Sequence, residues 1–351
     1  MEIDFGGAGE IAFERRGKAG LMRLTRPKAL NALTRTMVNA MQRALDAWSA
    51  DPAVLCVIVE GEGRAFCAGG DILAAYRAGR SGKPLYEFFA DEYRLNAHIR
   101  HFPKPYISII DGIVMGGGVG ISVHGSHRVV TENVVFAMPE VGIGFFPDVG
   151  GSAFLPHLPE HFGTYLALSG NRIGQGDCLQ SGIATHAIRA EDRERLRRSL
   201  IRTGDPEKAL KGKTVNPDFE TSEAMRDMIS VLFDSPTLGG CLIRLAAAGA
   251  NGSEEAQKLL DLIKTRSPTS LHVSFRQIEE GRDLDMDQCM QMEYRILSRM
   301  LENHDFYEGV RALLVDKDNS PVWNPAKIDD ITPEMIDAYF ASLGERELQL
   351  T

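Results

Sequence analysis

Two runs, the continuously apolar residues 54–59 and the mainly apolar residues 106–110, constrain the fold of this chain most strongly. A half-exposed strand alternates apolar and polar residues, whereas a strand covered on both faces has no need to. The runs therefore predict buried strands of the kind found in parallel sheets. Before the first run, apolar residues recur at helical spacing after Thr34, which can cap a helix through its hydroxyl group, and a second helical stripe over residues 85–99 lies between the two runs. This alternation predicts an α/β fold.

Beyond about residue 190 the sequence becomes mainly helical. Residues 191–202 form a charged amphipathic pattern, and Ser267-Pro268 and Thr332-Pro333 each combine a capping hydroxyl with a proline in the first turn. Further short strands are expected earlier, at residues 21–24, 127–130 and 134–137. We therefore predict an α/β core over residues 1–195 and a helical region over residues 196–351 that packs on it.

The charge balance is acidic, with 48 Asp and Glu residues against 39 Lys and Arg residues. This balance argues against a nucleic-acid-binding protein, which usually needs a basic face. No apolar stretch is long enough to span a membrane, so no membrane partner is expected. The acidic start, Met1-Glu2-Ile3-Asp4, resembles neither a transit nor a signal peptide and favours a cytoplasmic location. The five cysteines are scattered without a CxxC pair, which argues against a disulfide framework and a zinc site.

Two glycine clusters, Gly69-Gly70 and Gly116-Gly117-Gly118, each follow a predicted strand. Glycine lets a ligand approach backbone N–H groups closely, and the second cluster precedes a predicted helix, whose N-terminus favours negative charge. Two N–H groups from different loops can form an oxyanion hole for a carbonyl. The alternative is that the glycines serve only turns and helix packing, because one cluster alone is a weak signal. Neither cluster satisfies GxGxxG, since position 121 is Ile, and dinucleotide binding is not expected.

Three carboxylates stand in apolar surroundings. Glu140 and Asp148 lie in a segment dominated by apolar, proline and glycine residues, where a carboxyl group can act as acid, base or nucleophile. Capping of surface turns is an equally weighted alternative for both. Glu92 interrupts the apolar stripe of a predicted helix, and a buried carboxylate is costly unless it is paired or used. It could instead lie at the edge of the stripe or pair with an arginine.

Other candidates are weaker. Cys67 beside the first glycine pair could be a nucleophile, but a packing role is favoured. His124 and His127 are three residues apart with no third ligand evident nearby, so no metal site is expected. The chain has no GxSxG motif and thus gives no support for an α/β-hydrolase triad.

Taken together, these motifs resemble the crotonase (enoyl-CoA hydratase/isomerase) superfamily, and within it the branch of β-hydroxyacyl-CoA thioester hydrolases. The superfamily features are residues 25–33 (TRPKALNAL), 65–72 (AFCAGGDI) and 116–118 (GGG). The hydrolase-like features are residues 115–125, 136–140 and 144–151, with further similarity at 267–271, 308–312 and 316–318. The resemblance thus covers nearly the whole chain.

The resemblance implies a spiral of ββα units with a mainly helical C-terminal region, residues 1–195 forming the acyl-CoA-binding catalytic core. It implies that Gly70 and Gly117 donate their N–H groups to the thioester oxygen. Hydratases use two glutamates; Gly120 occupies the position of one, whereas Glu140 keeps the other. The hydrolase pattern adds Asp148 and the substrate-site Glu92, so the implied substrate-binding residues are Glu92, Gly117, Glu140 and Asp148. The implied contacts to CoA are Arg26, Lys28, Ala68, Gly69, Asp71 and Ile72.

The implied activity is hydrolysis of a short β-hydroxyacyl-CoA, expected to be 3-hydroxyisobutyryl-CoA in valine breakdown, with Glu140 and Asp148 as the catalytic residues. Two alternatives stay open, an enoyl-CoA hydratase or isomerase and a non-catalytic acyl-CoA-binding protein. No metal or organic cofactor is expected, because a thioester is already an activated carbonyl. The expected partner is the acyl-CoA substrate. A homo-oligomer is a further expectation, since trimers and hexamers are usual in the superfamily, although the C-terminal region could cover the surfaces that they use.

Overall fold

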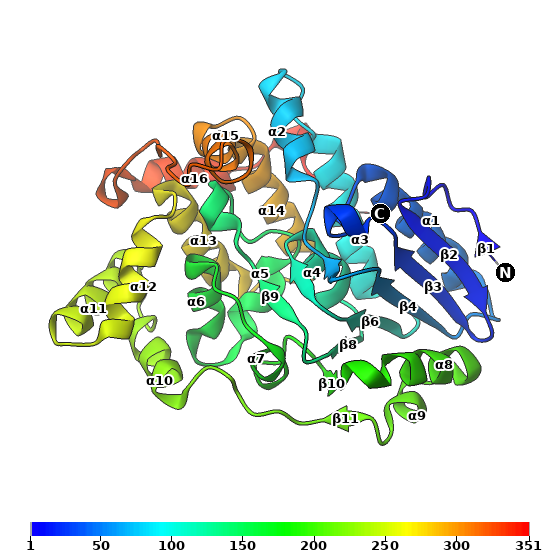
Figure 1. Cartoon of the computed structure of the whole chain (residues 1–351). Helices are drawn as coiled ribbons and strands as arrows, with labels where there is room; N and C mark the ends of the chain where they lie inside the picture. The colour runs from blue at the N-terminus through cyan, green and yellow to red at the C-terminus, as the bar shows by residue number, and fades with distance from the viewer. Residues whose placement is uncertain (1, 351) are drawn as a thin grey trace. The chain divides into compact units, whose positions relative to one another are not determined.

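A computed structural model describes residues 2–350 and shows two compact units that interleave along the chain (Figure 1). The first unit comprises the chain up to Asp71, Phe88–Phe136 and Ile173–Glu220. The second comprises Ile72–Glu87, Ala137–Arg172 and the chain from Thr221 onward. The sequence predicted two contiguous regions, residues 1–195 and 196–351. That division of the chain stays a prediction.

The first unit is built on an eight-stranded sheet in the order β1-β2-β3-β4-β6-β8-β10-β11. Strands β3, β4, β6, β8 and β10 run parallel to one another, and the edge strands pair antiparallel. The parallel centre agrees with the prediction of buried strands. The bounds are β1 (Glu2–Ile3), β2 (Ile11–Arg16), β3 (Ala19–Leu24), β4 (Cys56–Gly61), β6 (Tyr106–Ile110), β8 (His127–Val130), β10 (His186–Ile188) and β11 (Thr214–Val215).

A smaller sheet has the order β5-β7-β9, with bounds β5 (Ala65–Cys67), β7 (Ile113–Met115) and β9 (Val135–Ala137). Along the chain, a strand of the large sheet is followed by a strand of the small sheet and then by a helix: β4, β5 and α2 (Ile72–Arg80), then β6, β7 and α4 (Gly117–Val123). This order confirms the expected ββα repeat.

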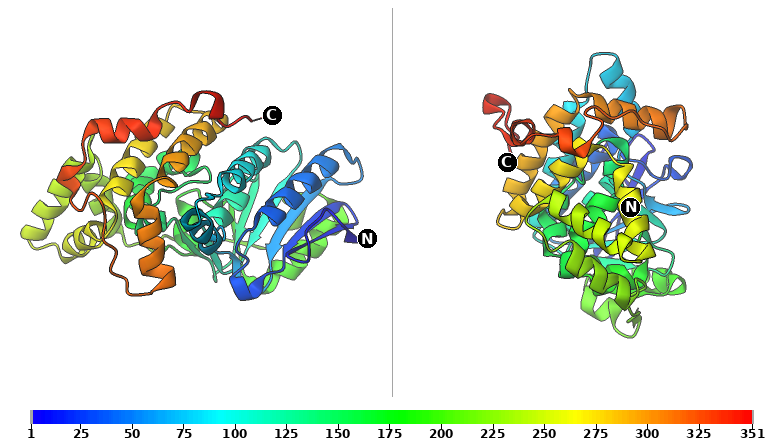
Figure 2. Two further views of the ribbon diagram at one scale, coloured as in Figure 1. Left: turned by 90° about the horizontal axis from the view of Figure 1, so that it is seen from above. Right: turned by 90° about the vertical axis from the view of Figure 1, so that its left-hand side faces the viewer.

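Helices cover the large sheet on both faces. On one face α1 (Arg35–Ala50) lies alongside the strands (Figure 2), and Gly20 of β3 leaves room for Trp48, into which a Cβ would run. On the other face, alternate residues of β3, β4 and β6 form one buried apolar cluster with Leu196 and Leu200 of α8 (Arg193–Thr203). The remaining helices of this unit are α3 (Tyr86–His101, from Phe88 onward), α7 (Gln175–Gln180) and α9 (Pro206–Leu210).

Several local predictions can be compared directly with the structure. Thr34 caps α1 by accepting a bond from Met37 N at 3.2 Å, as expected. The run predicted at residues 54–59 is a strand only from Cys56, two residues late. The reason is that Val54 N bonds to Asp51 O in a turn, so that pairing with β3 begins at Ala19 and Cys56.

The second unit is mainly helical, which confirms the helical C-terminal region. Ser267 and Thr332 cap their helices by accepting bonds from Ser270 N and Met335 N, as predicted. None of the helices within residues 2–350 combines the length and the apolar character that a membrane span requires. Besides α2, the bounds are α5 (Gly151–Phe154), α6 (Phe162–Ser169), α10 (Glu223–Leu232), α11 (Leu238–Ala250), α12 (Glu254–Lys264), α13 (Pro268–Gly281), α14 (Met286–Met300), α15 (His304–Val310) and α16 (Pro333–Phe340).

Candidate active site

The two predicted glycine loops face each other in the first unit. Gly69 has a φ of +116°, a conformation that glycine adopts readily and other residues rarely. A Cβ at Gly69 would lie 3.5 Å from Met115 O and 3.8 Å from Gly117 N. The end of β5 therefore lies against the start of α4.

Gly70, Gly117 and Glu92 come together at this point. A Cβ at Gly117 would lie 3.2 Å from Gly70 N and would collide with Glu92 Oε1. Because Gly117 is the first residue of α4, its N–H precedes the i→i−4 ladder of the helix. Two backbone N–H groups from different loops are thus close together beside a carboxylate, an arrangement that can polarise a carbonyl oxygen.

The first loop is fixed by the turn near residue 31. Leu33 N donates to Gly69 O at 2.8 Å, and Asp71 N donates to Leu33 O at 3.0 Å. Asn31 is fully buried, and its Nδ2 donates to Glu62 O and to Ala65 O, both at 2.9 Å. This network holds the backbone around Gly70 in one conformation.

Most of the residues predicted to contact CoA belong to this loop, and Arg26 contacts it. Ala68 N bonds to Leu30 O at 3.0 Å, and Ile72 is the first residue of α2 in the second unit. The guanidinium of Arg26 forms ion pairs with Glu10 at 3.5 Å and with Asp71 at 3.4 Å. Lys28 is exposed in the short 3-10 helix Pro27–Ala29. Arg26 therefore bridges two carboxylates of its own chain, whereas Lys28 extends from the surface.

Glu92 lies on the buried face of α3. Its side chain is 2 % exposed, among apolar neighbours on the helix such as Phe88 and Leu95. The structure thus places it inside the stripe that it interrupts, not at the edge. The carboxylate lies beside Gly117, where only a residue without a Cβ fits.

The other two predicted carboxylates belong to the second unit. Glu140 begins a 3-10 helix, Glu140–Ile143, and Asp148 follows it on a loop. Glu140 is 6 % exposed and Asp148 is 5 % exposed. Among the described residues, Glu140 Oε2 is buried without a hydrogen-bond partner. Burial raises the pKa of Glu140 well above its ordinary 4.5, and the charge of Asp148 raises it further. The two carboxylates are therefore buried neighbours, not surface caps.

Another buried carboxylate, Glu293 of α14, was missed by the sequence analysis. It is 0 % exposed, and its charge also raises the pKa of Glu140. Burial raises the pKa of Glu293 itself to about 8. The signal was the same as for Glu92: Glu293 interrupts an apolar stripe that includes Met290 and Leu297.

The weaker candidates have structural surroundings. Cys67 is 0 % exposed, and burial raises the pKa of its thiol to about 12, so it is a poor nucleophile. His124 is buried in the interior. Within residues 2–350, no group of three or more His, Cys, Asp or Glu residues could hold a metal ion.

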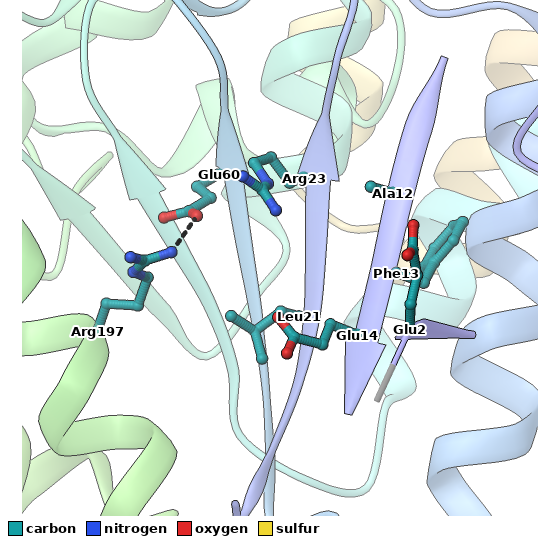
Figure 3. A pocket seen from close by; sticks show the side chains of 8 residues that line it. All are labelled: Glu2, Ala12, Phe13, Glu14, Leu21, Arg23, Glu60 and Arg197. Carbon is teal, nitrogen blue, oxygen red and sulfur yellow. Dashed lines mark hydrogen bonds and ion pairs between the residues drawn. The ribbon is translucent and has the colours of Figure 1, made fainter. Parts of the chain in front are cut away.

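A polar hollow of about 270 Å³ lies elsewhere in the first unit (Figure 3). Its described lining includes Glu14, Arg23 and the ion pair that Arg197 and Glu60 form at 3.2 Å, but no residue of the predicted site. The acidic and basic side chains that line this hollow largely neutralise one another.

Comparison with known proteins gives consistent relatives. The model of the family described as enoyl-CoA hydratase/isomerase matches residues 19–340. A Xenopus tropicalis protein named "3-hydroxyisobutyryl-CoA hydrolase, mitochondrial" is 43 % identical, over 97 % of this chain and 91 % of its own length. The Homo sapiens protein of the same name is 40 % identical over the same shares of the two chains.

Solved structures of similar fold carry different names. A protein from Mycobacterium thermoresistibile described as a carnitinyl-CoA dehydratase superposes with a TM-score of 0.91 at 38 % identity, covering 97 % of this chain and 98 % of its own. A Rhodobacter sphaeroides protein described as an enoyl-CoA hydratase has a TM-score of 0.87 at 35 % identity, covering 97 % of this chain and 99 % of its own. The crotonase-like fold expected from the sequence is therefore confirmed.

Proposed function

Given that the chain belongs to the enoyl-CoA hydratase/isomerase family, we propose that it hydrolyses the thioester of 3-hydroxyisobutyryl-CoA. The products are CoA and the free hydroxy acid, as in valine breakdown. The observation that carries the proposal is the 43 % identity, over 97 % of the chain, to a relative named for this reaction. A similar short β-hydroxyacyl-CoA is the wider substrate class.

The residue at position 120 argues against the hydratase alternative. Hydration of a double bond by the family's paired-carboxylate mechanism needs two glutamates, and the position of the first is Gly120 here, which is buried in α4. Glycine offers no acid or base. The names of the two solved relatives keep a hydratase or dehydratase as the rival to be tested.

The thioester oxygen would be held by Gly70 N and Gly117 N. Negative charge develops on this oxygen as the carbonyl carbon becomes tetrahedral, and fixed N–H donors stabilise that charge. One such donor is typically worth about 3–4 kcal/mol of transition-state stabilisation. Their fixed backbone means that no reorganisation is needed during the reaction.

Glu140 would supply the nucleophile. Its carboxylate attacks the carbonyl carbon, the C–S bond breaks, and CoA leaves as the thiolate; water then cleaves the mixed anhydride. In the direct route, Glu140 instead takes a proton from a water molecule that attacks the same carbon. A raised pKa makes Glu140 a stronger base once ionised, which suits either route. Asp148 would assist proton transfer or bind the β-hydroxyl, and Glu92 would support the substrate.

The CoA moiety would lie along the backbone of Ala68, Gly69, Asp71 and Ile72. Of the two predicted cations, Lys28 is exposed and suited to a phosphate, whereas Arg26 already bridges Glu10 and Asp71. We therefore assign Lys28 to the phosphates and Arg26 to the shape of the loop. No metal or organic cofactor is part of the proposal.

Substitution of Glu140 by Gln tests the assignment. Gln has nearly the same shape but can neither attack the carbonyl nor accept a proton, so thiol release should fall at least 1,000-fold while the fold persists. The matched control is Glu255→Gln, the same change at an exposed position of α12. Near-normal thiol release by Glu140→Gln would show that another group does the chemistry.

Location and assembly stay predictions. The relatives' names place those proteins in mitochondria, so the comparisons do not support the cytoplasmic location that was expected for this chain. Cell fractionation and light scattering would test the location and the expected homo-oligomer.

A further inference from the structure

The loop that carries Asp148 has an unfavourable backbone. Val149, directly after Asp148, has a φ of +53°, and Gly150 has a φ of +88°. A left-handed conformation is costly for a β-branched residue, and such residues persist only where the surroundings hold them. Some contact must therefore keep this turn in place.

Two buried side chains from different helices hold the turn. Gln277 of α13 donates from Nε2 to Pro147 O at 2.6 Å, on the near side of Asp148. On the far side, Glu293 of α14 accepts bonds from Gly150 N at 2.8 Å and from Ser152 N at 2.9 Å, as well as from Ser152 Oγ. Both helices pack against α5, which begins in this turn (Figure 1).

We propose that Glu293 is a positioning residue for hydrolysis: it grips the turn from Val149 to Ser152 and thereby fixes Asp148 beside Glu140. This inference rests on the proposed thioesterase function for its catalytic consequence. Its structural half, the grip on the turn, stands independently of any activity.

A carboxylate suits this position better than its amide. Glu293 uses both oxygens as acceptors, Oε2 for Gly150 N and Oε1 for Ser152 N and Oγ. A glutamine there has one acceptor oxygen, and its NH₂ group would face an N–H or O–H donor. Glu293→Gln therefore breaks the grip on one side of the turn and leaves a buried donor unsatisfied.

At pH values near and above the pKa of about 8, where Glu293 is ionised, loss of its charge has a second effect, on Glu140. The groups that raise the pKa of Glu140 electrostatically are Asp148 and Glu293. Arg266 and Asp305 also face the 3-10 helix of Glu140, at Gly142 and Gly144 respectively, and neither is changed by the substitution. Removal of one of the coupled carboxylates lowers the pKa of those that remain.

The test compares Glu293→Gln, Ser152→Ala and the control Glu255→Gln with the wild type. It measures thiol release across pH and hydrogen–deuterium exchange of the peptide over residues 146–154. For Glu293→Gln we expect at least a tenfold loss of kcat, faster exchange in this peptide and an acid limb of the pH–rate profile at lower pH. A purely structural role would leave that limb unmoved. Ser152→Ala, which removes one donor and keeps Glu293, should show a smaller loss of kcat and a smaller rise in exchange.

Unchanged exchange and kcat in Glu293→Gln would overturn the proposal, and so would a loss of kcat with an unmoved acid limb. If Glu293→Gln fails to fold, Ser152→Ala decides: wild-type exchange and kcat in that variant would contradict the grip. If the wild type released no thiol, the proposed function would be wrong. The claim that Glu293 holds the turn could still be tested, because hydrogen–deuterium exchange does not depend on activity.

Discussion

A single methyl group at Gly117 should disable the site while leaving the fold nearly intact. Gly117 lies in α4 with a helical, not a left-handed, backbone, so Gly117→Ala adds no backbone strain. The new Cβ would collide with Glu92 Oε1 and would lie 3.2 Å from Gly70 N. The cost is therefore purely steric and falls on Glu92 and on Gly70 N, which is one of the two donors of the proposed oxyanion hole.

The magnitudes follow from these contacts. Overpacking in a tight interior typically costs about 1–3 kcal/mol, and replacing glycine by alanine in a helix returns about 1 kcal/mol. The net loss of folding stability should thus be about 0–2 kcal/mol. Displacing one oxyanion donor typically costs 10²–10³ in kcat. Activity should therefore fall far more than stability.

The assay is thiol release at saturating substrate, with thermal unfolding of the same preparations. The matched control is Gly239→Ala, the same change in α11, where a Cβ would meet nothing within 4 Å. The control should keep wild-type turnover. If a folded Gly117→Ala also kept turnover within threefold of wild type, the N–H of Gly117 would have no part in catalysis.

Three further predictions concern other parts of the two units. First, the folded state raises the pKa of Glu140, so that between about pH 4.5 and this raised pKa the native protein holds a proton that the unfolded chain has lost. The free energy of unfolding should therefore fall as the pH rises through this range, by up to about 1.4 kcal/mol per pH unit. Glu140→Gln should therefore have a higher Tm than wild type at pH 7 but not at pH 4, and an equal Tm at both would contradict this sign. Second, Cys67→Ala should keep thiol-release activity within a fewfold, because burial raises the pKa of the thiol to about 12; inactivation would instead indicate a chemical role. Third, Asn31→Ala should lower the free energy of unfolding, measured with denaturant, by about 2–4 kcal/mol, because the buried side chain donates hydrogen bonds to Glu62 O and Ala65 O. A decrease below about 1 kcal/mol would refute that role.

The sequence predicted the elements whose signals are local. The cap at Thr34, the strand at residues 106–110 and the helix starts at Ser267 and Thr332 each follow from a few neighbouring residues, and the structure has them all. The start of β4 was displaced because a turn at Asp51 claims Val54 first. Where the turn ends and the strand begins depends on pairing with β3, whose residues are distant in sequence, so local patterns do not give the boundary.

The site shows the same division. Glu92 was recognised because a carboxylate in an apolar stripe is anomalous, and its burial follows the prediction. Glu293 carries the same anomaly, but its partners Gly150 and Ser152 lie more than 140 residues away, so nothing local says what it holds. The left-handed Val149 was equally invisible, because valine gives no sequence signal for that conformation.

The central claim is that the chain cleaves a thioester and does not add water to a double bond. The most direct test gives the wild-type protein 3-hydroxyisobutyryl-CoA, crotonyl-CoA and a 3-enoyl-CoA in parallel, and follows free thiol and the double bond separately. We predict thiol release from 3-hydroxyisobutyryl-CoA and no loss or migration of the double bond in the other two. Double-bond chemistry without thiol release would contradict the account and identify a hydratase or isomerase, and binding without any turnover would identify a non-catalytic acyl-CoA-binding protein.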